Sequence, residues 1–177
     1  MDSEPFTVVT VDFETVLPIW QNEIWPGRVT PIKPIAPMTY LGGYDMDIPN
    51  LYKPTFFAIF DEFGRIIGTT SGYQTSADHF RCRTMYVNPE FRRRGLAVAL
   101  VRAVEDAAIK AGCDLSWGLP RVSPMMAMFE KCGWTQVSEP ITEGMEFGPN
   151  VYMMKDGLRP KKKRKRRSRK KSSEIVR

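Results

Sequence analysis

The sequence predicts one α/β domain with a mixed sheet, followed by a basic tail. Its 177 residues include 42% hydrophobic and 26% charged residues, an ordinary globular composition that is sufficient for one core. Alternating and helical patterns follow one another in the order β-α-loop-β-β-β-α-β-α-β-β. The composition of residues 158–177 then changes abruptly to lysine and arginine. We therefore expect a folded domain over residues 1–157 and a disordered tail over residues 158–177.

The first third of the domain contains a strand, a helix and a long loop. A β-branched segment predicts a strand over residues 7–11, and Asp12 is expected to cap a helix over residues 14–23. Residues 26–54 contain six prolines, which excludes a long helix or a central strand. The same stretch is too apolar for a solvated linker. We expect an ordered loop with one short helix, packed on the body of the domain.

Three strands are expected next. A hairpin joins strands over residues 56–60 and 65–70 through a turn at residues 61–64, and Gly72 is expected to mark a bend. Alternation of Phe80, Cys82, Thr84 and Tyr86 with the residues between them predicts the fourth strand over residues 80–87.

The rest of the domain alternates helices and strands. Apolar residues at helical spacing predict the longest helix over residues 96–111, followed by a strand over residues 114–118. A second helix is expected over residues 123–132, and its first residue, a serine, is a suitable cap. The last two strands are expected over residues 135–138 and 151–155.

The junction between the fourth strand and the long helix carries the strongest chemical signal. Residues 87–97 contain a strand end, an Asn-Pro turn, three arginines, a glycine and the start of the helix. Backbone amides at the start of a helix, with the positive end of its dipole, form a site for a phosphate-bearing ligand. The three arginines raise the local positive potential further. A solvated run of charge in front of a helix is the alternative interpretation.

This junction resembles the acyl-coenzyme A binding motif of the GNAT superfamily of N-acetyltransferases. Arg92, Gly95 and Ala97 match the family pattern Gln/Arg-x-x-Gly-x-Gly/Ala. Residues 128–134 resemble the late helix-to-strand segment of the same family, and the two matches together cover roughly residues 55–156. The resemblance implies the GNAT fold, a central, mostly antiparallel twisted sheet of six or seven strands flanked by helices.

The resemblance also implies an activity and a set of binding residues. GNAT enzymes transfer an acetyl group from acetyl-coenzyme A to a primary amine by direct attack in a ternary complex, and they need no metal. Amides of the fourth strand hold the pantetheine arm and polarise the thioester carbonyl, while amides at the helix start hold the diphosphate. The implied positions in this sequence are Met85, Tyr86 and Val87 on the strand, and Arg92, Arg93, Arg94, Gly95, Leu96 and Ala97 at the helix.

The group that protonates the leaving thiolate is not fixed by the sequence. Many family members use a tyrosine at the position of Phe129, and a phenyl ring cannot donate a proton. Tyr86, Cys132 and Tyr73 are alternatives, as is water. We expect Phe129 to be a core aromatic and Cys132 to be a small buried hydrophobic residue.

The general base is equally open. The fourth strand contains no acid, but Asp78 and His79 precede it and Asp114 starts the fifth strand. His79 has a suitable intrinsic pKa, although a surface position at a strand start explains it as well. Asp45 and Asp47 in the proline-rich loop could bind a cationic acceptor or be turn residues. In the family this loop usually helps to form the acceptor pocket, and a structural cap over the sheet is the alternative.

The distribution of charge indicates possible binding partners, and the cysteine content indicates the cellular compartment. Residues 159–177 hold 12 of the 26 basic residues and one of the 20 acidic residues, so a mildly acidic domain carries a strongly basic tail. Residues 159–171 predict non-specific binding to nucleic acid, with an import signal or a solubilising tail as alternatives. Three dispersed cysteines and one histidine favour a reducing compartment and disfavour a zinc site. No apolar run approaches 18 residues and no signal core is present, so we expect a cytoplasmic protein, nucleoid-associated or, in a eukaryotic host, nuclear.

These observations leave three functional hypotheses. The first is an N-acetyltransferase whose acceptor is a small amine, an antibiotic, a polyamine, a protein N-terminus or a lysine. The second is a catalytically inactive GNAT-fold binding protein, tethered to nucleic acid by its tail. The third is a nucleic-acid module in which the tail alone supplies the function.

Overall fold

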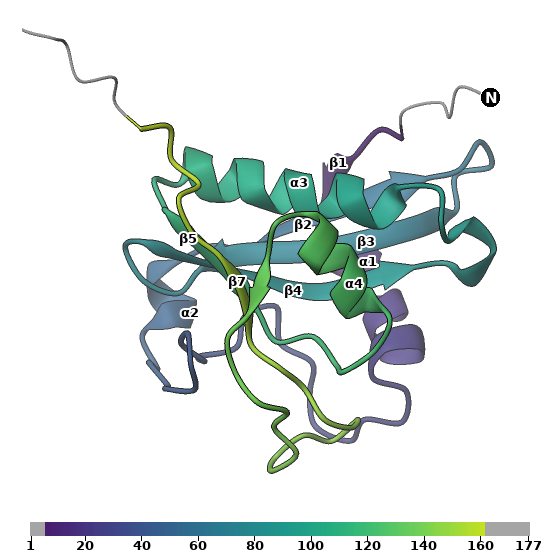
Figure 1. Cartoon of the computed structure of the whole chain (residues 1–177). Helices are drawn as coiled ribbons and strands as arrows, with labels where there is room; N and C mark the ends of the chain where they lie inside the picture. The colour runs from purple at the N-terminus through teal and green to yellow at the C-terminus, as the bar shows by residue number, and fades with distance from the viewer. Residues whose placement is uncertain (1–5, 162–177) are drawn as a thin grey trace, which may run out of the picture.

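The computed structural model describes residues 6–161. A seven-stranded sheet lies between two layers of helices and loops (Figure 1). In chain order, the elements are β1 (Val9–Val11), α1 (Phe13–Ile19), the π-helical turn η1 (Trp20–Ile24), α2 (Ile48–Leu51), β2 (Thr55–Phe60), β3 (Ile66–Gln74), β4 (His79–Val87), the 3₁₀ turn η2 (Pro89–Phe91), α3 (Leu96–Lys110), β5 (Leu115–Gly118), α4 (Met125–Lys131), β6 (Thr135–Gln136) and β7 (Met153–Lys155). No helix in this part of the chain is long and apolar enough to cross a membrane.

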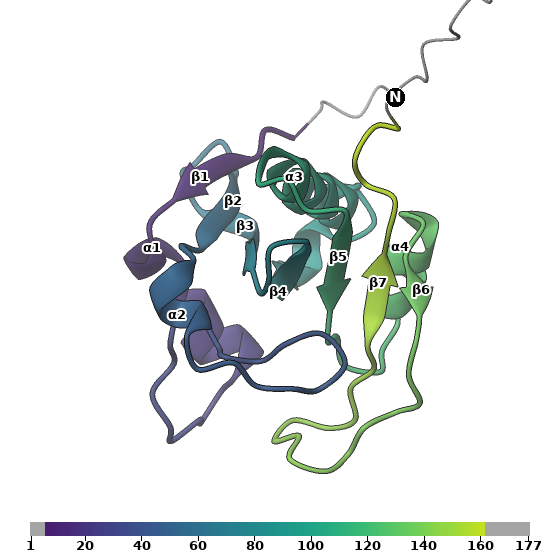
Figure 2. The same ribbon diagram turned by 90° about the vertical axis from the view of Figure 1, so that its left-hand side faces the viewer.

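The strands follow the order β1-β2-β3-β4-β5-β7-β6. All neighbouring pairs are antiparallel except β4 and β5, which are parallel and are joined through α3. The predicted mixed, mostly antiparallel sheet of six or seven strands is therefore confirmed. Helices α3 and α4 cover one face, and α1, η1, α2 and the long loop cover the other (Figure 2).

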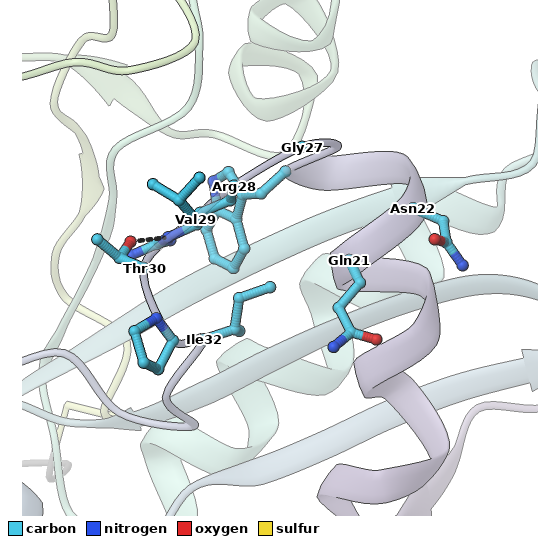
Figure 3. A pocket seen from close by; sticks show the side chains of 9 residues that line it. Gln21, Asn22, Gly27, Arg28, Val29, Thr30 and Ile32 are labelled. Carbon is cyan, nitrogen blue, oxygen red and sulfur yellow. Dashed lines mark hydrogen bonds between the residues drawn. The ribbon is translucent and has the colours of Figure 1, made fainter.

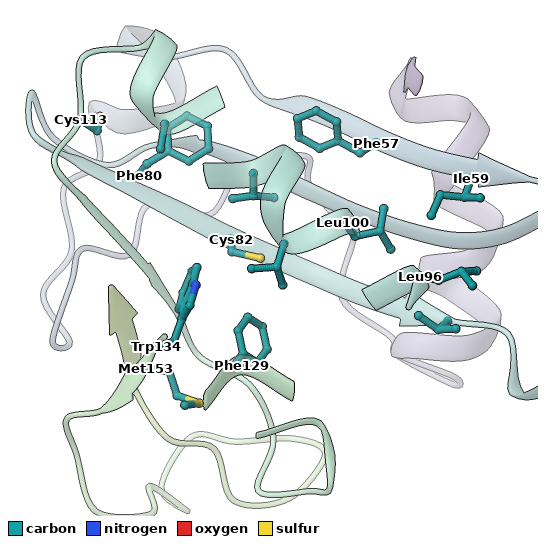
Figure 4. Packing of buried hydrophobic residues seen from close by; sticks show 14 of the residues in the cluster. Phe57, Ile59, Phe80, Cys82, Leu96, Leu100, Cys113, Phe129, Trp134 and Met153 are labelled. Carbon is teal, nitrogen blue, oxygen red and sulfur yellow. The ribbon is translucent and has the colours of Figure 1, made fainter. Parts of the chain in front are cut away.

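The main core lies between the sheet and α3 (Figure 4). Leu96, Leu100 and Val104 recur at helical spacing, so α3 buries a continuous apolar face against β3 and β4. The opposite face of the sheet has smaller clusters, one around Trp20 and Phe56 beneath η1 and another around Tyr73 beneath α2.

The first helix differs from its prediction in one respect. Asp12 caps it as expected, because its carboxylate accepts the backbone N–H of Thr15 at 3.0 Å. The α-helix ends at Ile19, however, and the following turn is π-helical up to Ile24. Turns of this kind often occur at functional sites. The predicted loop over residues 26–54 is ordered, with the one short helix α2.

Gly72 does not mark a bend, and that prediction is wrong. β3 continues through this position to Gln74, and Gly72 pairs with Thr55 on one side and Cys82 on the other. A Cβ atom at this position would lie 2.4 Å from Cε1 of Phe80. Glycine is required here because the Phe80 ring closely approaches the backbone.

The boundary of the tail also differs from the prediction. The amide of Leu158 donates to the carbonyl of Asp114 at 3.0 Å, and the amide of Arg159 donates to the Asp114 carboxylate at 3.0 Å. The Arg159 guanidinium lies 3.3 Å from the carboxylate of Asp78. Residues 158 and 159 thus belong to the folded body rather than to a disordered tail. Most of the segment predicted to bind nucleic acid lies outside the described residues.

Candidate active site

β4 and β5 are paired over only part of their length. They pair only over three positions, the last of which joins Arg81 to Trp117. β5 ends one residue later at Gly118, where a Cβ atom would lie 3.3 Å from the carbonyl of Cys82. Beyond this point β4 continues to Val87 without a partner on its β5 side. The two strands therefore stop pairing here, and we call the region beside the unpaired second half of β4 the wedge.

A bulge interrupts β4 beside this wedge. Ser71 pairs with Arg83 and Thr69 pairs with Tyr86, so two residues of β4 lie opposite Thr70. One of them, Thr84, has a φ of 65°, which is uncommon for a residue other than glycine. Its hydroxyl lies 3.0 Å from the Ser71 hydroxyl, and this contact fixes the bulge to β3.

The bulge reverses the alternation of side chains, which the sequence analysis did not predict. Cys82 and Val87 both face the main core, although in a regular strand residues with an even number of residues between them point to opposite faces. Arg81 and Arg83 face the opposite side of the sheet, toward the long loop. A bulge leaves backbone groups out of the regular ladder, and here it does so next to the wedge.

The start of α3 follows the end of β4 through a short connection (Figure 1). It presents a group of free backbone amides. Within the described residues, the backbone amides of residues 93–98 have no hydrogen-bond acceptor, and no side chain caps the helix. Arg93 and Gly95 have φ angles of 61° and 87°, which turn this loop into a concave cradle. A Cβ atom at Gly95 would have nothing within 4 Å, so the cradle is open above the glycine. The arrangement can bind a phosphate group.

Three arginines surround this cradle. Arg92, Arg93 and Arg94 are exposed, and Arg94 lies over the Phe91 ring at 5.1 Å. Nε of Arg92 donates to the carbonyl of Val87 at 3.3 Å, which ties the loop to the end of β4. The residues of the predicted binding motif therefore lie together, and their role in binding remains a prediction.

Of the predicted proton donors, Tyr86 lies closest in sequence to the cradle at the start of α3. It follows the bulge directly and is half-buried. Burial raises the pKa of its hydroxyl, and the charge of Glu23 raises that pKa further, while Arg92 lowers it. The phenol is therefore protonated at neutral pH and can donate a proton. Glu23 lies on η1, which packs against β4, and the sequence analysis did not single it out.

His79 and Cys132 lie elsewhere. His79 is the first residue of β4, at the end opposite the bulge, and its ring packs edge-on against Tyr40 at 5.5 Å. Cys132 follows α4, and its carbonyl accepts a hydrogen bond from Lys155 at 2.9 Å. Burial raises the pKa of the Cys132 thiol. Neither residue is brought to the wedge between β4 and β5.

The remaining candidates have structural partners. Phe129 is 3% exposed and packs on Trp134, with ring centroids 5.1 Å apart. The Tyr73 hydroxyl is buried and accepts the amide of Ala36 at 3.2 Å. Three of the four acidic candidates have carboxylates that contact other groups: Asp78 and Asp114 contact Arg159, and Asp45 accepts the amide of Asp47. Within residues 6–161, no three His, Cys, Asp or Glu side chains are grouped as metal ligands.

A surface hollow lies outside the wedge. It has a volume of about 420 Å³ and is lined by η1 and the following loop (Figure 3). Arg28 stands in it over the Trp25 ring at 4.9 Å. None of its lining residues belongs to β4 or α3, so this hollow is separate from the cradle.

Comparison with known proteins agrees with this geometry. The sequence model of the acetyltransferase (GNAT) family matches residues 20–134, which is more than half of the chain. The chain belongs to the GNAT acetyltransferase family. The match includes the cradle at the start of α3 and the whole of β4 and β5, and it confirms the family resemblance of the sequence.

Several relatives of this GNAT protein are known. Acetyltransferase plu1384 of Photorhabdus laumondii is 30% identical over 105 residues, which cover 58% of this chain and 64% of that protein. This chain thus spans less than two thirds of that relative's length. A crystal structure described as an N-acetyltransferase from Lactobacillus plantarum has a TM-score of 0.62 at 15% identity, covering 87% of this chain and 99% of that one. Nourseothricin acetyltransferase has a TM-score of 0.55 at 18% identity, covering 66% and 71%. At these identities the solved structures show a common fold.

Proposed function

We propose that this GNAT protein transfers an acetyl group from acetyl-coenzyme A to a primary amine within a ternary complex. The observation that carries the proposal is the open cradle of unpaired amides at residues 93–98, directly beside the wedge between β4 and β5. Membership of the family implies the donor, acetyl-coenzyme A. The identity of the amine and the residues that act on it are part of the proposal.

The cradle holds the diphosphate of the coenzyme. Amides of Arg93 to Ala97 donate to the phosphate oxygens, and the dipole of the 15-residue helix α3 adds to this attraction. Arg92, Arg93 and Arg94 neutralise the remaining charge. Arginines at the start of a helix oppose its dipole, so an anion bound here also explains why three of them are tolerated.

The second half of β4 holds the reactive end of the donor. The pantetheine arm lies in the wedge, where it takes the place of the missing β5 partner of residues 82–87. The amides of Met85, Tyr86 and Val87 orient the arm and polarise the thioester carbonyl. The amine nitrogen attacks the carbonyl carbon, the C–N bond forms, and the C–S bond breaks.

Two protons must move in this reaction. The amine loses one, and the leaving thiolate gains one. Tyr86 can supply the second, because its raised pKa keeps the phenol protonated. Glu23, whose charge acts on Tyr86, is the candidate acceptor of the first, directly or through water.

Release of free coenzyme A from acetyl-coenzyme A, measured with a panel of primary amines, tests the proposal. We expect amine-dependent release by the wild-type protein and none by Gly95→Asp, because the new carboxylate occupies the cradle. Gly64→Asp is a matched control. Gly64 also has a positive φ, 77°, and open space around its Cβ position, but it lies in the β2–β3 turn. Coenzyme binding without release by any amine would support the inactive binding protein instead.

A further inference from the structure

β4 carries two arginines on the face that looks toward the long loop. Arg81 is 7% exposed, although arginine is rarely buried without an acidic partner. Arg83 is partly buried, and its guanidinium lies 5.4 Å from the Trp20 ring and 5.0 Å from the Trp25 ring. Both residues directly precede the bulge, on the side of the sheet opposite α3.

The two arginines differ in how their nitrogen atoms are satisfied. Nη1 of Arg83 donates to the carbonyls of Lys33 and Pro34 at 2.8 and 3.3 Å, so Arg83 holds the long loop against the sheet. Nη1 of Arg81 donates to the Tyr73 hydroxyl at 3.3 Å. Nε of Arg81 is buried without any partner among residues 6–161, and its Nη2 has no hydrogen-bond acceptor there either. Nε and Nη2 form the edge of the guanidinium that binds a carboxylate with two parallel hydrogen bonds.

The described part of the chain supplies no carboxylate to this edge. No Asp or Glu oxygen of residues 6–161 lies within 4.0 Å of either guanidinium. The positive charges instead accumulate: the pKa of Arg83 is lowered to about 10, mainly by burial and also by the neighbouring charges of Arg81 and Arg28, while Tyr73 opposes the shift. Burying a cation without a counter-ion destabilises the folded state. A bound anion removes this destabilisation, so the two arginines are suited to an anion-binding site.

Aromatic rings enclose the same position. The Arg81 guanidinium lies 4.8 Å from the centre of the Trp117 ring, and Trp117 packs on Tyr152 and Tyr40. These rings come from three separate segments, namely β5, the residues that lead into β7, and the long loop. Aromatic rings packed around a guanidinium exclude water and strengthen a charge-assisted hydrogen bond.

We propose that the acetyl acceptor is an amine that also carries a carboxylate, and that Nε and Nη2 of Arg81 bind that carboxylate. The inference rests on the proposed function, since it names the substrate class of the same site. Arg81 lies four residues before Met85 on β4, with the bulge between them, so the carboxylate and the reacting amine bind at separate points along the strand. An ω-amino acid, whose methylene groups separate its amine from its carboxylate, is the class that matches two such points.

Calorimetry with two successive titrations tests the inference and keeps it separate from the proposed function. The first titration adds coenzyme A to the protein, and its failure contradicts the proposed function alone. The second adds 6-aminohexanoate, or 6-aminohexanamide, to protein saturated with coenzyme A. These probes differ only in the carboxylate, and we expect the acid to bind about 10- to 100-fold more tightly than the amide, the usual strength of a hydrogen-bonded charge pair.

Arg81→Gln should reduce this preference to about twofold or less while leaving coenzyme A affinity unchanged. Arg102→Gln, at an exposed position on α3, removes the same charge and should leave both properties unchanged. The thermal midpoint of Arg81→Gln shows whether the variant folds. If it does not fold, Arg81→Lys, which keeps the charge but loses the planar fork, should show an intermediate preference. Equal binding of acid and amide by the wild-type protein, or no binding of either, overturns the inference, as does an unchanged preference in Arg81→Gln.

Discussion

The close contact between Gly72 and Phe80 allows a stability prediction worked from distances. A Cβ atom at Gly72 would lie 2.4 and 3.2 Å from Cε1 and Cζ of Phe80 and 3.3 Å from the carbonyl of Arg81. The backbone oxygen prevents the methyl group from moving away, so the ring must shift. Phe80 is 4% exposed within the main core, and overpacking of this kind costs about 1–3 kcal/mol. Replacing a glycine within a strand by alanine by itself stabilises the folded state by about 0.5–1 kcal/mol.

We therefore expect Gly72→Ala to lower the free energy of unfolding by about 1–2 kcal/mol, which is a loss of about 2–8 °C in Tm for a chain of this size. Guanidinium denaturation followed by tryptophan fluorescence measures the effect. In a Phe80→Leu background both crowding ring atoms are absent, so the alanine should be neutral or stabilising, with a coupling energy of about 1–2 kcal/mol. Gly64→Ala, in open space, should show no coupling to Phe80. A Gly72→Ala protein as stable as the wild type, or strictly additive effects, would refute the reasoning.

Three further predictions concern a proton donor, a buried thiol and a helix cap. Tyr86→Phe should lower kcat by about tenfold or more without weakening coenzyme A binding, because the thiolate loses its proton donor; an unchanged kcat would assign that role to water. Burial raises the pKa of Cys82 to about 11, so at pH 8 only about one molecule in a thousand carries the thiolate, and a maleimide pulse read by mass spectrometry should modify Cys132 well before Cys82. Equal rates at the two thiols would contradict the burial of Cys82. Asp12→Ala should lower Tm at neutral pH, because hydrogen bonds from Thr15 lower the pKa of Asp12 from 3.8. This stabilisation is present above pH 3.8 and is lost as the pH falls through the lowered pKa. A Tm difference between the two proteins that persists in stronger acid would argue against the cap.

Local patterns were sufficient for most of the fold. The apolar spacing of Leu96, Leu100 and Val104 identifies α3, and alternation identifies the first half of β4. These patterns succeed because each element buries one face against a single core. The start of α3 could be located for a related reason: a turn, a positive-φ glycine and a helix start are all encoded within a few neighbouring residues.

The features that the sequence did not reveal depend on distant pairings. The bulge of β4 depends on the pairing of Arg83 with Ser71 of β3, and no local pattern around Thr84 predicts it. Gly72 has its role because of the Phe80 ring across the strand pair. In an alternating strand a charged residue such as Arg81 normally faces solvent. The long loop covers that face and buries the charge, and only the three-dimensional structure shows this.

Calorimetric titration of the protein with coenzyme A tests the central claim most directly, because the donor site depends on the free amides at the start of α3. We expect the wild-type protein and Gly64→Asp to bind with the same affinity, and Gly95→Asp to lose binding while it keeps the wild-type circular dichroism spectrum. Equal affinity in all three proteins would show that the coenzyme is not held at these amides, and it would contradict the account.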